Sequence, residues 1–170
     1  MPRPDLFTVP EWYHNYIRQI REDSVNEAIR ANTPMAVSFL RSIPEEKWGY
    51  RYADSKWSIR EMVQHIIDAE RVFAYRALCI ARGEKTSLPG FDENSYAALS
   101  KADKRGMEDL ITEFETVRTS IEQLYASFDE EQLAATGIAN NNRISVNAIG
   151  FIIAGHVKHH MNILNERYLS

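Results

Sequence analysis

The fold is decided by a stretch between Ser58 and Gly83, which reads SIREMVQHIIDAERVFAYRALCIARG. Its apolar residues recur every three or four positions, which is the period of an amphipathic α-helix. Ser58 and Glu61 have the spacing of a capping box at a helix start, and Gly83 is a natural helix stop. The apolar positions are Ile59, Met62, Val63, Ile66, Ala69, Val72, Phe73, Ala77 and Ile80. The stretch therefore predicts one long helix with a continuous packing face.

Similar periodicity on both sides predicts a chain that is mostly helical. We expect further helices over residues 10–21, 24–41, 103–127 and 145–168, with one short turn over 129–133. The capping-box pattern recurs at Thr8-Val9-Pro10-Glu11 and Ser24-Val25-Asn26-Glu27, and Ser145 can cap the last helix. Pro34 is expected to kink or interrupt the helix that contains it.

The segments between these helices contain the remaining turn residues. Residues 84–101 have turn chemistry and predict a long, ordered loop, and the three asparagines at 140–142 predict a polar break. No region alternates apolar and polar residues convincingly over the length of a strand. We therefore predict an all-α, four-helix bundle formed by a single domain over residues 1–170.

Composition excludes several classes of partner. The chain has 170 residues and a formal net charge of −4, so it lacks the positive field typical of proteins that bind nucleic acid or anionic membranes. No apolar run approaches the roughly 18 residues of a membrane span, and the first residues do not form a signal peptide. Cys79 is the single cysteine, which suits a reducing compartment. These features predict a cytoplasmic protein without a nucleic-acid or membrane partner.

Two of the five histidines lie on the apolar face of the last predicted helix. His156 and His160 continue a stripe at steps of three and four that also contains Ile149, Ile152 and Ile163. One helical turn separates the two imidazoles, so they can converge on a single ion.

A third histidine lies on the packing face of the helix after Ser58. His65 follows Met62 by three positions and precedes Ala69 by four, so its ring can approach the other two across the bundle. Buried imidazole nitrogens without partners each cost about 1–3 kcal/mol, and a shared ion removes that cost. Three histidines with one open position are typical of catalytic zinc sites, although nickel also suits imidazole ligands. An ordinary hydrogen-bonded core histidine is the alternative at each position.

Other polar residues near these histidines have two interpretations each. Asp68 can orient an imidazole or accept a proton, which makes it our candidate catalytic residue; alternatively it pairs with Arg71 on the helix surface. Glu70 and Arg71 can instead pair with a neighbouring helix, and Arg76 can serve an anionic substrate. Residues 92–94 either cover the pocket or cap the following helix.

The two remaining histidines and the cysteine are less informative. His159 lies one residue off the stripe, where it can be exposed or can assist a ligand, and His14 is expected at the surface or in packing. Cys79 is expected to be a small core residue rather than a nucleophile.

Several short motifs resemble the DinB-like superfamily, close to the branch that contains YfiT-type proteins. Their order and separation match over about residues 50–168. They are Lys56-Trp57-Ser58-Ile59-Arg60-Glu61 with His65, Asp68-Ala69-Glu70-Arg71, Phe73-Ala74-Tyr75-Arg76-Ala77-Leu78, Leu88-Pro89-Gly90-Phe91-Asp92-Glu93-Asn94 and Ala154-Gly155-His156-Val157-Lys158-His159-His160.

This resemblance implies a four-helix bundle that binds a divalent ion, commonly nickel or zinc, through His65, His156 and His160. It also implies a homodimer and a small-molecule substrate. The superfamily includes transferases that use low-molecular-weight thiols such as bacillithiol, a mycothiol-dependent isomerase, and presumed hydrolases. We therefore predict transfer of such a thiol to an electrophilic small molecule. The alternatives are a metal-dependent hydrolase and a non-catalytic helical module that a metal stabilises.

Overall fold

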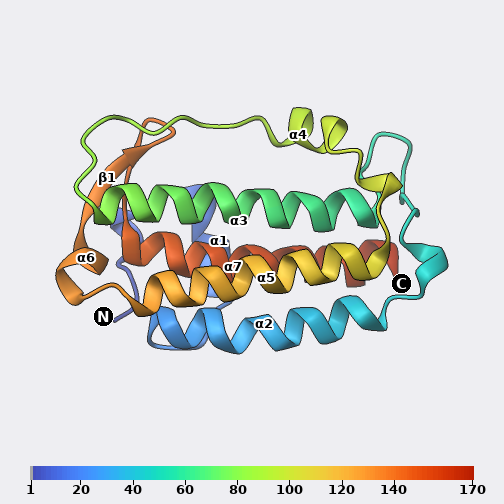
Figure 1. Ribbon diagram of the computed structural model, residues 1–170, viewed down its shortest axis with the longest axis horizontal. Helices are drawn as coiled ribbons and strands as arrows, with labels where there is room; N and C mark the ends of the chain where they lie inside the picture. The colour runs from blue at the N-terminus through green and yellow to red at the C-terminus, as the bar shows by residue number, and fades with distance from the viewer. Residues whose placement is uncertain (1) are drawn as a thin grey trace.

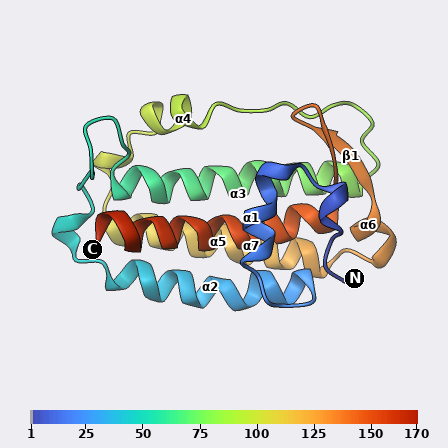
Figure 2. The same cartoon turned by 180° about the vertical axis from the view of Figure 1, so that it is seen from behind.

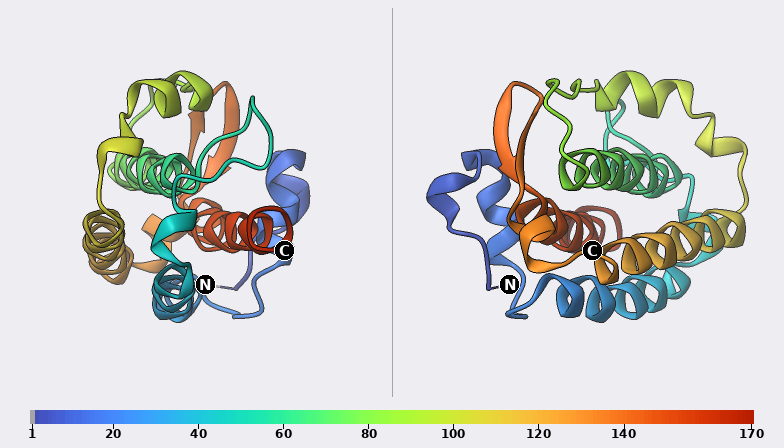
Figure 3. Two further views of the ribbon diagram at one scale, coloured as in Figure 1. Left: turned by 90° about the vertical axis from the view of Figure 1, so that its right-hand side faces the viewer. Right: turned by 60° about the vertical axis from the view of Figure 1, so that its left-hand side comes forward.

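The computed structural model describes residues 2–170 and confirms a bundle of four long helices. They are α2 (Val25–Ser42), α3 (Ile59–Ala81), α5 (Met107–Ala126) and α7 (Val146–Ile163), and a π-helical turn, Leu164–Tyr168, extends the last. Seen end-on, the four helices occupy the corners of a quadrilateral (Figure 3). Each of α2 and α3 packs against both α5 and α7, and the shared interior contains the core.

Two consecutive long helices of this bundle, α3 and α5, run in the same direction instead of antiparallel. In Figure 1, α3 and α5 both run from right to left, whereas α2 and α7 both run from left to right. The segment between α3 and α5 therefore returns along the whole length of the bundle before α5 begins. It contains α4 (Glu93–Leu99) and a 3₁₀ turn, Ala102–Lys104. Long connections of this kind allow two neighbouring helices to be parallel.

Local signals set most helix ends as expected. At Ser58 both hydrogen bonds of the capping box form, and Gly83 has the positive φ of +85° that suits a glycine after a helix. Ser24 and Ser145 each accept a backbone N–H in the first turn of their helices. Asp129 forms a capping box with Gln132 at the start of α6 (Glu130–Ala134), close to the predicted short turn.

Four local predictions were wrong. The Thr8 capping box does not form, because the Thr8 hydroxyl donates to the Asp5 carbonyl; the first predicted helix is only a 3₁₀ turn, Glu11–Tyr13, followed by α1 (His14–Arg18). Of the two effects expected of Pro34, the interruption does not occur, because the tertiary packing of α2 outweighs one missing hydrogen bond. The segment 84–101 is not all loop, because Asp92 caps α4 through the amides of Asn94 and Ser95.

The fourth wrong prediction is the absence of strands. β1 (Thr136–Ala139) and β2 (Asn142–Ser145) form an antiparallel hairpin at the end of the bundle where α7 begins. Asn140 and Asn141 have φ values of 50° and 61°, which asparagine tolerates in the two-residue turn that suits a hairpin. The strands are only four residues long, so alternation is too brief to detect in the sequence.

Figure 2 shows α1 lying across α7 on the outside of the bundle, near the hairpin. The helices within residues 2–170 include no segment long and apolar enough to cross a membrane.

Candidate metal centre

The structure brings together the three histidines that the sequence singled out. His65 lies in the second turn of α3, and His156 and His160 lie one turn apart on α7, which packs antiparallel to α3. The Nε2 atom of His156 is 3.2 Å from Nε2 of His65 and 3.0 Å from Nε2 of His160. The three potential ligand atoms lie within 4.8 Å of one another. Three imidazoles that are separate in sequence therefore point at one place.

Burial keeps these imidazoles neutral near pH 7. All three are buried, with at most 8% of any of them exposed. Burial lowers the pKa of His65 to about 4. It also lowers the pKa values of His156 and His160 well below the usual value, and the neighbouring imidazoles add to this effect. Neutral imidazole is the form that binds a metal ion.

The hydrogen-bond inventory of the cluster fits a bound cation. A neutral imidazole carries one N–H and one lone pair, so three mutually close Nε2 atoms cannot all be satisfied by one another. The Nδ1 atoms of His156 and His160 are buried and have no hydrogen-bond partner among residues 2–170, so an ion at the Nε2 atoms satisfies the Nε2 lone pairs and not these two Nδ1 groups. With the proton on Nδ1, each ring presents its Nε2 lone pair to the same point, as a zinc or nickel site requires.

A cavity of about 330 Å³ opens onto the cluster. Its walls come from the 3₁₀ turn Glu11–Tyr13, α1, Trp57 just before α3, α3 itself, the segment between α3 and α5, the hairpin turn and α7. The lining residues are Trp12, Tyr13, Tyr16, Trp57, His65, Ala69, Phe73, Arg76, Phe91, Glu93, Asn140, His156 and His160. Aromatic rings and polar side chains share the lining of this cavity, and cavities that combine apolar surface with polar groups are typical of small-molecule sites.

Two aromatic rings rest directly against the histidines. The Trp57 ring centroid is 4.7 Å from that of His65, and the Tyr16 ring is 5.4 Å from that of His156. Tyr16 reaches this position because α1 crosses α7 at Gly155, where an added Cβ would lie 2.1 Å from the Tyr16 carbonyl oxygen. No sequence pattern singled out Tyr16, although Gly155 beside His156 is a local sign of a close approach there.

The structure places Asp68 away from the cluster, whereas Arg76 and Glu93 line the cavity that opens onto it. Asp68 does not line the cavity; it accepts a hydrogen bond from Gln64 at 3.0 Å, and burial raises its pKa. Its charged neighbours are Arg71, Glu113 and Arg105, but no ion pair within residues 2–170 joins Asp68 to Arg71, which pairs with Glu113 instead. A residue three positions after His65 is rotated by about 60° around the helix, which is enough to face a different neighbour.

The remaining histidines lie outside the three-residue group. His159 is half-buried with its ring 5.0 Å from that of Tyr16, and Nε2 of His14 lies 2.8 Å from the Val9 carbonyl oxygen.

Glu70 and Arg71 both pair with α5, as one of the two interpretations predicted. The Glu70 carboxylate accepts hydrogen bonds of 2.8 and 2.6 Å from Arg118, and both side chains are fully buried. Arg118 also donates to the Ile153 carbonyl of α7 at 3.2 Å, so this pair links three helices of the bundle. Arg71 pairs with Glu113 nearer the surface.

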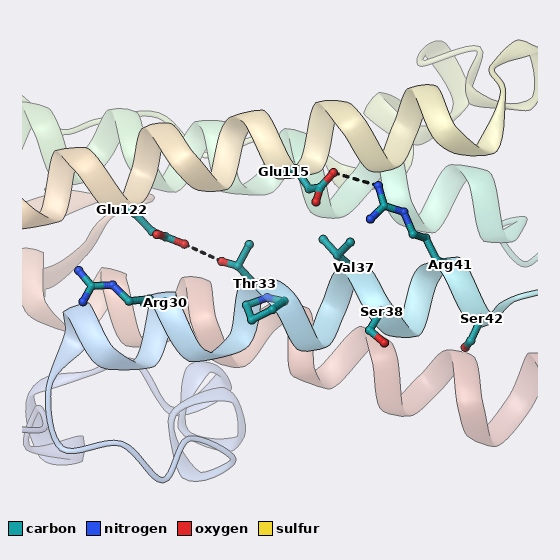
Figure 4. A pocket seen from close by; sticks show the side chains of 9 residues that line it. Arg30, Thr33, Val37, Ser38, Arg41, Ser42, Glu115 and Glu122 are labelled. Carbon is teal, nitrogen blue, oxygen red and sulfur yellow. Dashed lines mark hydrogen bonds and ion pairs between the residues drawn. The ribbon is translucent and has the colours of Figure 1, made fainter.

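A larger hollow between α2 and α5 has a different character. Its volume is about 880 Å³, and it contains no histidine (Figure 4). Four of its polar side chains pair with one another: Thr33 donates to Glu122, and Arg41 donates to Glu115.

Comparison with known proteins agrees with this geometry. The chain is 27% identical over 123 residues to a protein from Oceanobacillus iheyensis whose name assigns it provisionally to the metal-dependent hydrolases; the match covers 72% of this chain and 70% of that protein. The fold is similar to that of YfiT from Bacillus subtilis, described as a probable metal-dependent hydrolase with an unusual four-helix bundle topology. That match has a TM-score of 0.69 and 16% identity, and covers 98% of this chain and 90% of YfiT.

A second similar fold is that of the mycothiol-dependent maleylpyruvate isomerase. The TM-score is 0.68 at 11% identity, over 81% of this chain and 58% of the isomerase. The family model that describes the DinB superfamily matches residues 27–164, which include all three clustered histidines. The chain belongs to the DinB superfamily.

Proposed function

We propose that this chain is a divalent-metal-dependent enzyme that transfers a low-molecular-weight thiol, similar to bacillithiol, to an electrophilic small molecule. His65, His156 and His160 would hold Ni²⁺ or Zn²⁺. The observation that supports this most is the convergence of three neutral, buried imidazoles beneath a cavity large enough for a small molecule. A bound ion would lower the pKa of a thiol or a water molecule and so supply a nucleophile near neutral pH.

The protein's own residues contribute position and environment. The clustered group within residues 2–170 contains only these three ligands, and neither Asp68 nor His159 joins it. Structural zinc sites usually have four protein ligands, so three favour a catalytic site over a purely stabilising one. The aromatic walls from Tyr16, Trp57 and Phe73 exclude water from the imidazoles and offer apolar contact to a substrate.

Hydrolysis is the second candidate, and the name of the Oceanobacillus relative supports it. The two reactions differ in whether thiol or water supplies the nucleophile. The fold shared with a mycothiol-dependent enzyme supports thiol as our first choice.

The test begins with metal content and continues with the reaction. Untagged protein is expected to bind about one ion per chain, His156→Ala is expected to lose it, and the distant His14→Ala is the matched control. Metal-loaded protein is then incubated with electrophiles, with and without a bacterial thiol. Conjugate that forms only with thiol supports transfer, and product without thiol supports hydrolysis. Wild-type protein without bound ion, or His156→Ala with unchanged ion content, would overturn the proposal.

We also propose a cytoplasmic homodimer that uses neither nucleic acid nor membrane as a partner. The resemblance to dimeric family members supports the dimer, and the net charge of −4 argues against a nucleic-acid or membrane partner. The single cysteine, Cys79, suits the reducing cytoplasm. Light scattering is expected to give twice the chain mass of 19.6 kDa.

A further inference from the structure

Arg76 is a buried cation in the cavity wall without an anionic partner. The residue is only 4% exposed, and it lies on α3 about three turns beyond His65. One terminal nitrogen donates to the Pro89 carbonyl at 2.7 Å, whereas Nε is buried without a hydrogen-bond partner. No ion pair within residues 2–170 involves Arg76. The guanidinium therefore retains unused capacity to bind an anion.

The other buried arginine, Arg118, differs from Arg76 because it forms an ion pair. Arg118 is fully buried and is matched by the Glu70 carboxylate within the core. The Glu93 carboxylate lines the same cavity, but no ion pair joins it or any other carboxylate of residues 2–170 to Arg76. Burial lowers the pKa of Arg76, while the Tyr13 side chain acts in the opposite direction. Arginine nevertheless remains charged in proteins, so this guanidinium is a desolvated positive charge at the edge of a cavity. A buried charge of this kind is costly unless something pairs with it.

The cavity places this charge close to the histidine cluster. The Arg76 guanidinium carbon is 5.9 Å from the centre of the Phe73 ring, and the Phe73 ring is 5.9 Å from that of His156. All three residues line the same cavity. A small molecule lying on Phe73 can thus reach Arg76 with one end and the histidines with the other.

We propose that Arg76 anchors a carboxylate, and that the substrates of this cavity are small apolar or aromatic molecules carrying a carboxylate a few bonds from the reacting atom. Guanidinium suits carboxylate because its parallel N–H groups match the two oxygens. The aromatic lining suits the apolar body of such a molecule. This inference rests on the proposed function for the reaction, but carboxylate binding itself requires no metal ion.

The experiment compares 3-phenylpropionate with its uncharged amide, 3-phenylpropionamide, on metal-free protein in the presence of a chelator. Binding is followed by the fluorescence of Trp12 and Trp57, which both line the cavity, and checked by calorimetry. Charge-assisted hydrogen bonds predict that the carboxylate binds at least about tenfold more tightly than the amide. Equal affinities in the wild-type protein would overturn the proposal.

Variants separate anion binding from the bond to Pro89. Arg76→Gln keeps an N–H donor for that carbonyl but has no charge, so it should bind the carboxylate and the amide about equally. Arg76→Lys should keep part of the preference for the carboxylate. Arg71→Met, which removes a surface arginine of the same helix, should keep the full preference. An undiminished preference in Arg76→Gln would contradict the role assigned to Arg76.

Wild-type protein offers a measurement that no folding defect can affect. The Nε–H resonance of Arg76, assigned by its absence from Arg76→Lys, should shift on addition of the carboxylate and not the amide; equal shifts would overturn the proposal. Because these measurements use metal-free protein, they are independent of the metal-content test. Metal binding without carboxylate preference rejects only the anchor, and carboxylate preference without metal binding rejects only the metal centre.

Discussion

At the scale of single residues, the three clustered histidines are buried, and their Nε2 atoms have only one another as hydrogen-bond partners among residues 2–170. His65 packs against Trp57 and has its pKa lowered to about 4, whereas an unfolded histidine titrates near 6.5. The folded protein therefore holds this ring in a state that becomes unfavourable when the pH falls.

The first prediction concerns the stability of the metal-free protein in acid. Between pH 6.5 and 4 the unfolded chain binds a proton at His65 that the folded chain does not, so the free energy of unfolding falls as pH decreases. The contribution of His65 reaches about 3 kcal/mol at the acid end of this range and vanishes above pH 7. Urea denaturation in chelator at pH 7.5 and 4.5 measures the fall. His65→Phe should show a smaller one, and an equal fall in both proteins would contradict the prediction.

The buried pair of Glu70 and Arg118 gives the second prediction. Arg118→Met should lower the free energy of unfolding by about 3–5 kcal/mol, because it leaves the Glu70 carboxylate buried without a cation. The double variant with Glu70→Leu should recover much of this loss, since both charges are then removed. Urea denaturation at pH 7.5 measures both. A loss below about 1 kcal/mol in the single variant would show that the pair is unimportant for stability.

At the scale of elements, the same sequence pattern has two outcomes. The S/T-x-x-E pattern at Ser58 forms a complete capping box, and the Ser58 hydroxyl also donates to Asp103 at 2.6 Å. The same pattern at Thr8 forms no cap, because that hydroxyl donates to the Asp5 carbonyl. Ser58 begins a helix that packs against α5 and α7, whereas no long helix follows Thr8. Capping patterns thus become caps where a helix is held by packing.

This contrast supplies the third prediction. Ser58→Ala should destabilise the protein by about 1–2 kcal/mol, because it leaves N–H groups unsatisfied at the start of the helix that contains His65. Thr8→Ala should stay within about 0.5 kcal/mol of wild type, as is usual for an exposed position. Thermal and urea unfolding of the two variants side by side test the difference, and equal losses would contradict it.

At the scale of the whole molecule, the proposed ligands come from two helices that are far apart in the chain. His65 belongs to α3, and His156 and His160 belong to α7. An ion bound to all three would link these helices in the folded protein and find no such site in the unfolded chain. Binding and folding should therefore be coupled.

The fourth prediction follows from this coupling. At free Zn²⁺ or Ni²⁺ of 100 times the dissociation constant, the free energy of unfolding should rise by about 2.7 kcal/mol. Differential scanning calorimetry with and without chelator measures the shift, and His14→Ala should retain it. His156→Ala should lose most of it. A shift of equal size in His156→Ala would place the stabilising ion elsewhere.

From the amino-acid sequence alone we could predict the long helices, most of their ends and the common helix face of His156 and His160. These features depend on interactions within about four residues, so the helical period of the sequence is enough to predict them. It also indicated that His65 faces a core, and the resemblance to the family joined that residue to the other two.

Which helices are neighbours, and which side chains surround the cluster, could be learned only from the folded structure. The parallel α3 and α5, the hairpin, and the approach of Tyr16 to His156 all depend on packing between distant segments. The surroundings of the charged residues on α3 also depend on this packing. Glu70 pairs with Arg118 in the core, whereas Arg76 lies in the cavity wall. Periodicity specifies the face on which a residue lies, but the partner of that face is set by how the whole chain minimises exposed apolar surface.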